Sequence, residues 1–296
     1  MKKVLLATTA LALSAGVASA EMSMAGYATA GLQNNGTDTY VVNRMEFNVD
    51  ASTETTSGST FGARTRVRLN AGDGDQGFSG ARVYMSTNGF TLAMGNINGA
   101  IWSIPGVWAS EVGLTGLNDA GVVFNTVANP AWGDTDGFSS QGVGTNGIEV
   151  LYSGGGFSGH LSYSEDTLSG DAAATNRRVA AYGAYTMGDW TVALAMHESD
   201  DNDEDKTIMV VNGKVGDYGL NFAAADNNGE TKIALTGSAT FGATSVNGFV
   251  ADEELGAELA MGLGVSYDLG GAAIVAAYEK DTAGDSLVEA GMSFSF

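Results

Sequence analysis

The chain has 296 residues, of which 34 are acidic and 13 are Lys or Arg, so its formal net charge at pH 7 is −21. This acidic excess argues against a nucleic-acid-binding protein, because such binding depends on Lys and Arg that neutralise phosphates. The chain contains no cysteine, which excludes a disulfide framework. Its 43 glycines beside 2 prolines are typical of many strands joined by tight turns, and a hydrophobic share of 44% argues against disorder.

The first twenty residues have the layout of an export signal. Lys2 and Lys3 precede an apolar, alanine-rich run over 4–18, and Ala18-Ser19-Ala20 has the small-x-small form of a cleavage site. We predict a signal peptide over residues 1–20 that is cleaved from the chain. The alternative, a membrane-spanning helix, needs about 20 apolar residues and different flanks.

The remaining chain, 21–296, is predicted to be a single domain. It keeps 11 basic residues against 34 acidic ones, a formal charge of −23. It has no apolar run long enough for a spanning helix, and its apolar residues alternate with polar ones. An exported chain of this kind is either a soluble β-protein or an outer-membrane barrel, the sheet form whose backbone groups are all satisfied in lipid.

The first predicted strands carry an unusual concentration of arginine. A hairpin over 21–32 and 40–50 is followed by the strand 59–70, and the next strand spans 79–86. Successive strand residues point to opposite faces, so arginines two residues apart share a face. Five of the seven arginines therefore fall on the polar faces of three consecutive strands, which would build one basic wall: Arg44, Arg64, Arg66, Arg68 and Arg82.

The alternation stops after the strand 90–96 and resumes near residue 147. The interruption, 97–146, is rich in large apolar residues, among them Trp102, Trp108 and Phe124. So long an irregular segment is seldom kept without a use. We expect it to pack against another part of the molecule, and part of it could be helical.

Strand pairs then continue to the end of the chain, and with the earlier ones they give about sixteen strands. Short glycine turns alternate with longer acidic loops such as 198–205. Short turns at one rim and long polar loops at the other are typical of an outer-membrane barrel, as are aromatic residues near the strand ends. The predicted pairs are 148–152 with 157–164, 178–187 with 190–197, 207–215 with 218–225, 231–240 with 243–250, and 257–267 with 272–278, followed by 287–296.

At this point the sequence resembles the general porins of Gram-negative outer membranes, most closely the alphaproteobacterial type. The resemblance covers the whole mature chain. Its features are the opening EMSMAGYATAGL (21–32), the strand TFGAR (60–64), a long third external loop after Met94-Gly95-Asn96, and a last strand that ends in Phe296. The resemblance implies an all-β, 16-stranded antiparallel transmembrane barrel that forms a homotrimer in the outer membrane, in contact with lipid and lipopolysaccharide. It also implies that the barrel-assembly machinery reads the Phe296 strand.

The same resemblance implies a constriction at the inward-folded third loop, 97–146. The basic side would be the five arginines, and the acidic side would be Glu111 and Asp119, ahead of Asp134 and Asp136. The function would be passive diffusion of small hydrophilic solutes and ions. We expect weak cation selectivity, because the acidic loops concentrate cations at the mouth while the arginines oppose them locally.

Other functions remain open from the residues alone. The arginines could form structural salt bridges with Glu46 and other lumen acids, and a substrate-specific channel for sugars or anions is the runner-up. A barrel enzyme is disfavoured, because His160 and Ser162 face the lumen without an evident triad. No cofactor is expected; weak candidates for a Ca²⁺ site are the loop acids Asp73, Asp75, Asp201 and Asp203, for which a solvated loop is the favoured interpretation.

Overall fold

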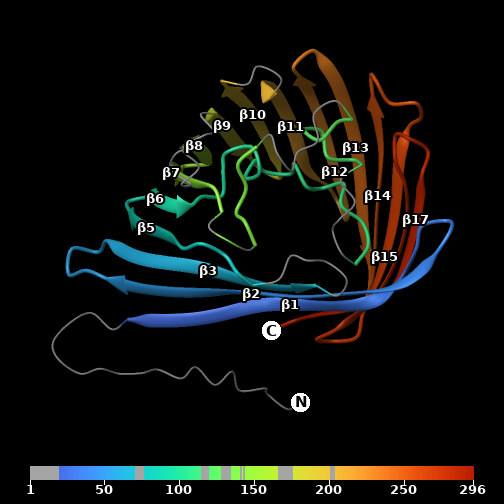
Figure 1. Cartoon of the computed structure of the whole chain (residues 1–296), viewed down its shortest axis with the longest axis horizontal. Helices are drawn as coiled ribbons and strands as arrows, with labels where there is room; N and C mark the ends of the chain where they lie inside the picture. Colours follow the sequence, from blue (N-terminus) through green and yellow to red (C-terminus); the bar gives the residue numbers. More distant parts are fainter. Residues whose placement is uncertain are drawn as a thin grey trace.

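The computed structural model describes residues 20–70, 77–114, 120–127, 135–140, 142, 144–165, 176–200 and 204–296. Its strands form one antiparallel sheet that closes into a barrel (Figure 1). β1 (Glu21–Asn34) closes it by pairing with both β2 (Thr39–Glu54) and β17 (Ser286–Ser295). Gly26 and Phe296 exchange backbone hydrogen bonds of 2.8 and 2.9 Å, which completes the seam.

Every strand between β2 and β17 pairs with the strands before and after it in the chain, except that β4 and β5 together occupy one strand position of the barrel. Both pair with β3, so the labelled strands make a 16-stranded barrel, as the sequence predicted. The intervening strands are β3 (Thr60–Asn70), β4 (Gly77–Phe78), β5 (Arg82–Thr87), β6 (Phe90–Asn96), β7 (Asn146–Gly154), β8 (Phe157–Glu165), β9 (Arg177–Met187), β10 (Trp190–Ser199), β11 (Lys206–Val215), β12 (Tyr218–Asn227), β13 (Glu230–Phe241), β14 (Thr244–Glu253), β15 (Ala260–Asp268) and β16 (Ala273–Lys280).

The strand predicted over 79–86 begins three residues later in the structure, where β5 starts at Arg82, and the two-residue β4 precedes Ser79. Ser79 accepts a hydrogen bond from the backbone N–H of Arg66 on its side-chain oxygen (2.9 Å), while its own N–H donates to the Arg66 carbonyl (2.8 Å). A side-chain oxygen thus replaces one backbone carbonyl of the ladder at Ser79. This interruption of the ladder lies between β4 and β5.

The strand faces alternate as predicted. On β10, Leu194 is 61% exposed on the outer face and its neighbour Ala193 is 1% exposed on the inner face. Exposed aromatic residues stand at the rim of short turns, where they form the girdle expected at a membrane interface. This girdle includes Phe61, Phe90, Phe157, Trp190, Tyr218, Phe241 and Phe294.

The segment between β6 and β7, residues 97–145, is called the inner loop here, because its described parts lie inside the barrel (green in Figure 1). Its described parts contain no helix, so the helical conformation we allowed for does not occur there. Hydrogen bonds from residue i+3 to residue i make successive turns instead, for example from Val107 to Ile104 (3.2 Å). Pro105 and Gly106, which has a φ of +85°, interrupt any helix at this point. Within the part of the chain that is described, no helix is both long and apolar enough to cross a membrane.

The inner loop has its own hydrophobic contact with the barrel wall. Its buried side chains, such as Ile101, Val107 and Phe124, pack against small inward-facing alanines of β9 to β16. Because alanine is small, the inner face of these strands leaves space that the loop fills. The strands that carry small inward residues and large outward ones therefore determine where the loop lies. The inward alanines of this contact are Ala180, Ala184, Ala193, Ala195, Ala223, Ala225, Ala234, Ala251, Ala260 and Ala277.

Enlarging one of these alanines should displace the loop. We expect Ala193→Leu to lower the free energy of unfolding by about 1–3 kcal/mol, because extra methylenes in a packed core force strain. Urea-induced unfolding of the refolded barrel measures the change. The outward Val192→Leu variant is the control, since Val192 is exposed; equal effects of the two variants would contradict the packing of the loop on this face.

Candidate pore constriction

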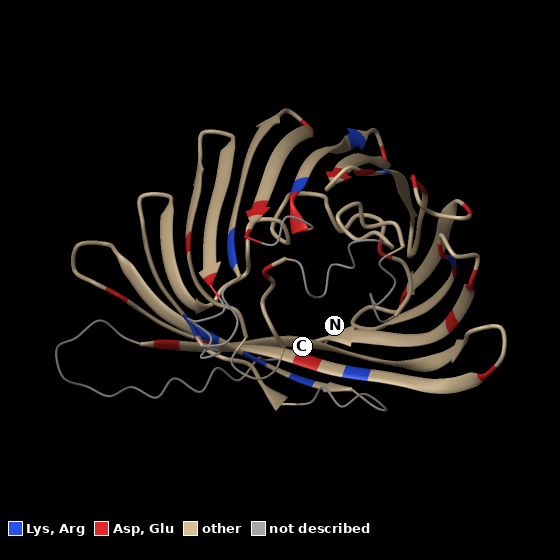
Figure 2. Cartoon of the chain, turned by 45° about the horizontal axis from the view of Figure 1, so that its top comes forward, with Lys and Arg blue, Asp and Glu red and all other residues tan. Residues whose placement is uncertain are grey.

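The hairpin register of β2 and β3 places a hydrogen-bond acceptor opposite each arginine of β3. Asp50 pairs with Arg64, Asn48 with Arg66 and Glu46 with Arg68. In the last pair the arginine is on β2 and the acceptor is on β3, because Arg44 lies opposite Asn70. All these residues share the inner face, so the basic wall predicted from the alternation exists as a ladder of paired side chains, which we call the arginine wall. Figure 2 marks the positions of basic residues in blue and of acidic residues in red along the strands.

The pairs of the ladder are close. Arg64 Nε donates to Asp50 Oδ1 at 2.7 Å, and Arg68 Nε donates to Glu46 Oε2 at 2.6 Å. Arg66 Nε lies 3.2 Å from both Asn48 Oδ1 and Glu46 Oε1. One carboxylate, Glu46, therefore pairs with two guanidiniums. Its negative charge offsets the repulsion between the like charges of Arg66 and Arg68, which are neighbours on the inner face of β3.

Arg44 and Arg82 extend the wall on its two sides. Arg44 is buried and donates from Nε to Asn70 Oδ1 at 3.0 Å. Arg82 lies opposite Arg64 in the register of β3 and β5, and its own partner is Glu149 of β7, with Nε to Oε1 at 2.5 Å. All five predicted basic residues are thus brought onto one stretch of the inner face.

Glu149 also fixes the start of the inner loop. Its Oε2 accepts from the backbone N–H of Asn98 (3.1 Å) and lies 2.9 Å from His160 Nε2. The Glu149 side chain is fully buried. Arg82, His160 and the first residues of the loop therefore depend on one carboxylate.

The returning limb of the inner loop contacts the arginine wall directly. Arg66 Nη1 donates to the Phe138 carbonyl (3.4 Å) and to Ser140 Oγ (3.3 Å), and its guanidinium lies 4.9 Å from the centre of the Phe138 ring. The contact combines long hydrogen bonds with a cation–π interaction. It joins the loop to β3.

A second set of contacts holds the loop against the strands β12 to β14. Lys232 Nζ donates to the Asn125 carbonyl at 2.5 Å and lies 3.2 Å from Glu253 Oε2. Glu253 Oε1 accepts from the backbone N–H of Val127 at 2.6 Å, and Asn227 donates to the Val123 carbonyl at 3.0 Å. Because Lys232 and Glu253 are almost completely buried, these contacts form a shielded clamp on the loop backbone.

The predicted loop acids fall in different places. Glu111 is half-buried, and its carbonyl accepts from Asn247 of β14 (2.8 Å), a strand separated from β2 by β15, β16, β17 and β1. Asp136 is buried and accepts from Ser164 of β8 (2.8 Å), so it anchors the loop. Asp119 and Asp134 lie outside the described residues.

The residues that suggested a barrel enzyme are used structurally. Ser162 Oγ accepts from the backbone N–H of Ala100 (3.0 Å), and His160 is bound to Glu149. Both side chains face inward and are buried beneath the loop, as the alternation predicted. They anchor the loop and form no nucleophile–base pair with each other.

The predicted calcium candidates, Asp73, Asp75, Asp201 and Asp203, lie outside the described residues. Elsewhere in the described ranges, no group of three His, Asp or Glu side chains could hold a metal ion. The nearby acids Asp200 and Glu204 are bound by arginines: Arg177 donates twice to Asp200 (2.7 and 3.1 Å), and Arg178 Nε donates to Glu204 (2.9 Å). The hydrogen bonds from Arg177 hold the pKa of the Asp200 carboxyl below its ordinary value.

Comparison with known proteins identifies the family. The sequence profile described as Gram-negative porin matches residues 7–296. The chain belongs to the Gram-negative porin family. It is 28% identical to a porin of Fuscovulum blasticum and 26% identical to a porin of Rhodobacter capsulatus, in each case over 93% of this chain and all of the relative. A solved mutant of Rh. blastica porin superposes with a TM-score of 0.81 at 25% identity, again over 93% of this chain and all of that one.

This porin is therefore an outer-membrane channel protein and not an enzyme. The fold agrees with that function, because a closed barrel satisfies its backbone groups within lipid and leaves polar side chains for its interior. The resemblance to porins of the alphaproteobacterial type is confirmed by the same comparisons.

Sequence reasoning missed several residues of this porin's interior. Asp50 and Glu149 were not singled out as partners of arginines, although Asp50 lies on the same face as Arg44 and Glu46 and a register assignment for the hairpin would have paired it with Arg64. Lys232 and Glu253 were also missed. Their alternation places them on the inner face, but nothing local indicates that they bind a loop more than 100 residues earlier in the chain.

Proposed function

We propose that small hydrophilic solutes and ions diffuse through this porin between the arginine wall and the inner loop, where they are filtered by size and charge. The observation that carries the proposal is the contact of the loop limb with Arg66, since it brings the loop to the ladder of charged residues. A polar solute that crosses here avoids the cost of several kcal/mol for each unsatisfied polar group buried in hydrocarbon.

The charge of the arginine wall sets the expected selectivity. Five guanidiniums stand with three carboxylates, Glu46, Asp50 and Glu149, which leaves a surplus of two positive charges. The chain without residues 1–20 carries −23 and has acidic loops. We propose weak cation selectivity, because the loops attract cations to the mouth while the wall opposes them locally.

In this proposal the acidic groups of the constriction do not form a separate row that faces the arginines. In this proposal, Glu46 and Asp50 supply acidic groups within the wall itself, so solutes meet alternating charges along one surface. Glu111 and Asp119 are retained as the contribution of the loop. Paired charges on one wall give a weaker transverse field than separated rows would, because each ion pair partly cancels its own field.

The absence of native cysteine makes the pathway testable with a single introduced thiol. Ser140 lies on the loop limb beside Arg66. We expect a Ser140→Cys channel in a planar bilayer to lose most of its conductance when a bulky, water-soluble methanethiosulfonate reagent reacts with the thiol, since the adduct narrows the pore.

A matched thiol at the barrel rim provides the control. Ser153→Cys lies at the exposed end of β7 beside a short turn, and its modification should leave the conductance nearly unchanged. Full modification of Ser140→Cys, verified by mass spectrometry, with no loss of conductance would place the pathway elsewhere.

The finer assignments of the proposal concern export and assembly. We propose that residues 1–20 are a cleaved signal peptide, that three copies assemble, and that the outer face contacts lipid and lipopolysaccharide. The last strand, with exposed Val288, Met292 and Phe294 and a terminal Phe296, supports recognition by the barrel-assembly machinery. Amino-terminal sequencing of the mature protein checks the cleavage after Ala20.

A further inference from the structure

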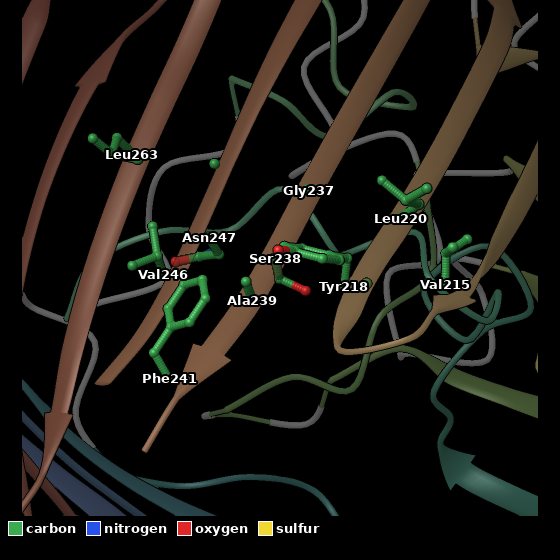
Figure 3. A pocket seen from close by; sticks show the side chains of 12 residues that line it. Val215, Tyr218, Leu220, Gly237, Ser238, Ala239, Phe241, Val246, Asn247 and Leu263 are labelled. Carbon is green, nitrogen blue, oxygen red and sulfur yellow. The ribbon is translucent and has the colours of Figure 1, made fainter. Parts of the chain in front are cut away.

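A groove lies on the outer face of the barrel across β11 to β15, away from the pore (Figure 3). Its volume is about 580 Å³. Three of its lining side chains carry a polar group, and only that of Tyr218 is on the outer face: Asn247 and Ser238 occupy inward positions of their strands, and Asn247 donates to the inner loop. The groove is lined by Val215, Tyr218, Leu220, Gly237, Ala239, Phe241, Val246, Gly248 and Leu263.

The floor of the groove is a glycine pair. Gly237 of β13 lies opposite Gly248 of β14, and the same row continues to Leu220 on one side and Leu263 on the other. Because neither glycine has a side chain, a recess remains between the two leucines. The register of the strands places the two glycines side by side and therefore determines where this recess lies.

The local backbone does not explain Gly237. Its φ is not in the left-handed region, and a Cβ atom placed there would meet no heavy atom within 4 Å. By contrast, Gly106 has a φ of +85° and a Cβ there would clash with Asn212. A glycine inside a strand loses stability relative to residues with side chains, and it often marks a place where an outside group approaches closely. The space above Gly237 is therefore left for a group that is not part of the chain.

The groove lies in the half of the membrane next to the short turns. Tyr218 begins β12 and Phe241 ends β13, both beside short turns and both exposed on the outer face. In outer-membrane barrels the short turns are periplasmic, and the aromatic girdle marks the interface. The recess therefore extends from the periplasmic interface toward the middle of the bilayer.

We propose that this groove binds an acyl chain of a phospholipid from the periplasmic leaflet, as a site distinct from the general lipid contact of the barrel. An acyl chain is apolar and flexible enough to reach the glycine floor between the leucines. The convex surface of a second barrel would touch Leu220, Leu263 and Phe241, which protrude, and would leave the floor empty. The site depends only on the outer face and is independent of where solutes pass.

The test is lipid retention by the complete protein in mild detergent. A phosphatidylethanolamine is added, the detergent concentration is raised stepwise, and native mass spectrometry counts the phospholipid bound to each chain. We expect wild type to retain about one molecule per chain under conditions that remove the rest. Gly237→Leu fills the floor and should weaken retention about tenfold or more, the effect of about two methylene groups losing their contact.

Ala181→Leu is the matched control. Ala181 faces outward on β9, away from the groove, and the register places it between the large side chains of Leu161 and Met196, without a glycine beside it. This variant should retain lipid like wild type. Single-channel conductance shows that each variant is folded, and Ala239→Leu narrows the groove from a second position if Gly237→Leu fails to fold.

Either of two results would overturn the proposal: wild type without a retained phospholipid, or Gly237→Leu with the same retention as wild type. If the second result comes with a change of oligomeric state in Gly237→Leu, the groove is assigned to contact with a second copy.

Discussion

Glu149→Ala is expected to lower the free energy of unfolding by about 3–5 kcal/mol, the cost of breaking a buried ion pair by removing one partner. The Glu149 carboxylate binds Arg82, His160 and the backbone N–H of Asn98, and it is fully buried. Its loss leaves a guanidinium without its carboxylate and an amide without its acceptor. Besides the loss of stability, we therefore expect the start of the inner loop to detach from β7.

Urea unfolding of the refolded barrel measures the first effect, and current noise in planar bilayers measures the second. Glu149→Gln keeps an acceptor for one of the three donors and should fall between wild type and alanine. The outward Val150→Ala variant controls for removal of a side chain from the same strand, since Val150 is exposed. Equal stability of Glu149→Ala and wild type would show that the cluster does not hold the loop.

Lys232→Met is expected to produce the second large effect, a loss of about 3 kcal/mol or more in the free energy of unfolding. Glu253 would remain buried without its ammonium partner, and the carbonyl of Asn125 would lose its donor. The clamp on the loop near Val127 would then be weakened. We expect larger and noisier single-channel currents, because the loop spends time away from β13 and β14.

The double variant Lys232→Met, Glu253→Leu separates the charge effect from the clamp. Replacing both partners of a buried ion pair by apolar side chains is often nearly neutral for stability, so the double variant should regain most of what the single variant loses. The hydrogen bonds to Asn125 and Val127 remain absent in it, and its current should stay noisy. A quiet current in the double variant would show that apolar packing alone holds the loop.

The barrel could be predicted from the sequence because its main signal has a period of two residues. Alternation placed Arg44, Arg64, Arg66, Arg68 and Arg82 on the inner face, and the structure has all five there. The loss of alternation after Asn96 also located the inner loop to within one residue, since β6 ends at Asn96 and β7 begins at Asn146.

The partners of those arginines could not be predicted in the same way. Which acceptor faces which arginine depends on the hairpin register, and a shift of two residues would keep every side chain on its face while changing every pair. At the interruption between β4 and β5, the Ser79 side chain accepts a hydrogen bond from the backbone N–H of Arg66. Both are set by geometry between strands and leave no pattern along the chain.

The contacts of the inner loop are harder still to predict. Lys232 binds a backbone carbonyl of Asn125, and Asn247 binds the carbonyl of Glu111. A backbone carbonyl exists at every residue, so the sequence of the loop does not identify the acceptor. The apolar content of the loop predicted that it packs against something, and the inward alanines show where.

The most direct test of the proposed pathway is the reversal potential of single channels under a salt gradient. Arg64→Ala, Arg66→Ala, Arg68→Ala removes three of five guanidiniums and leaves three carboxylates, which changes the wall from a surplus of two positive charges to one negative charge. Arg177→Ala, an exposed arginine paired with Asp200 outside the wall, is the control.

We expect wild type to insert in conductance steps grouped in threes with weak cation selectivity, and the triple variant to be clearly more cation-selective, while Arg177→Ala shifts the reversal potential much less. A folded triple variant whose reversal potential equals that of wild type would contradict the account, because the ions would then pass without sensing the arginine wall.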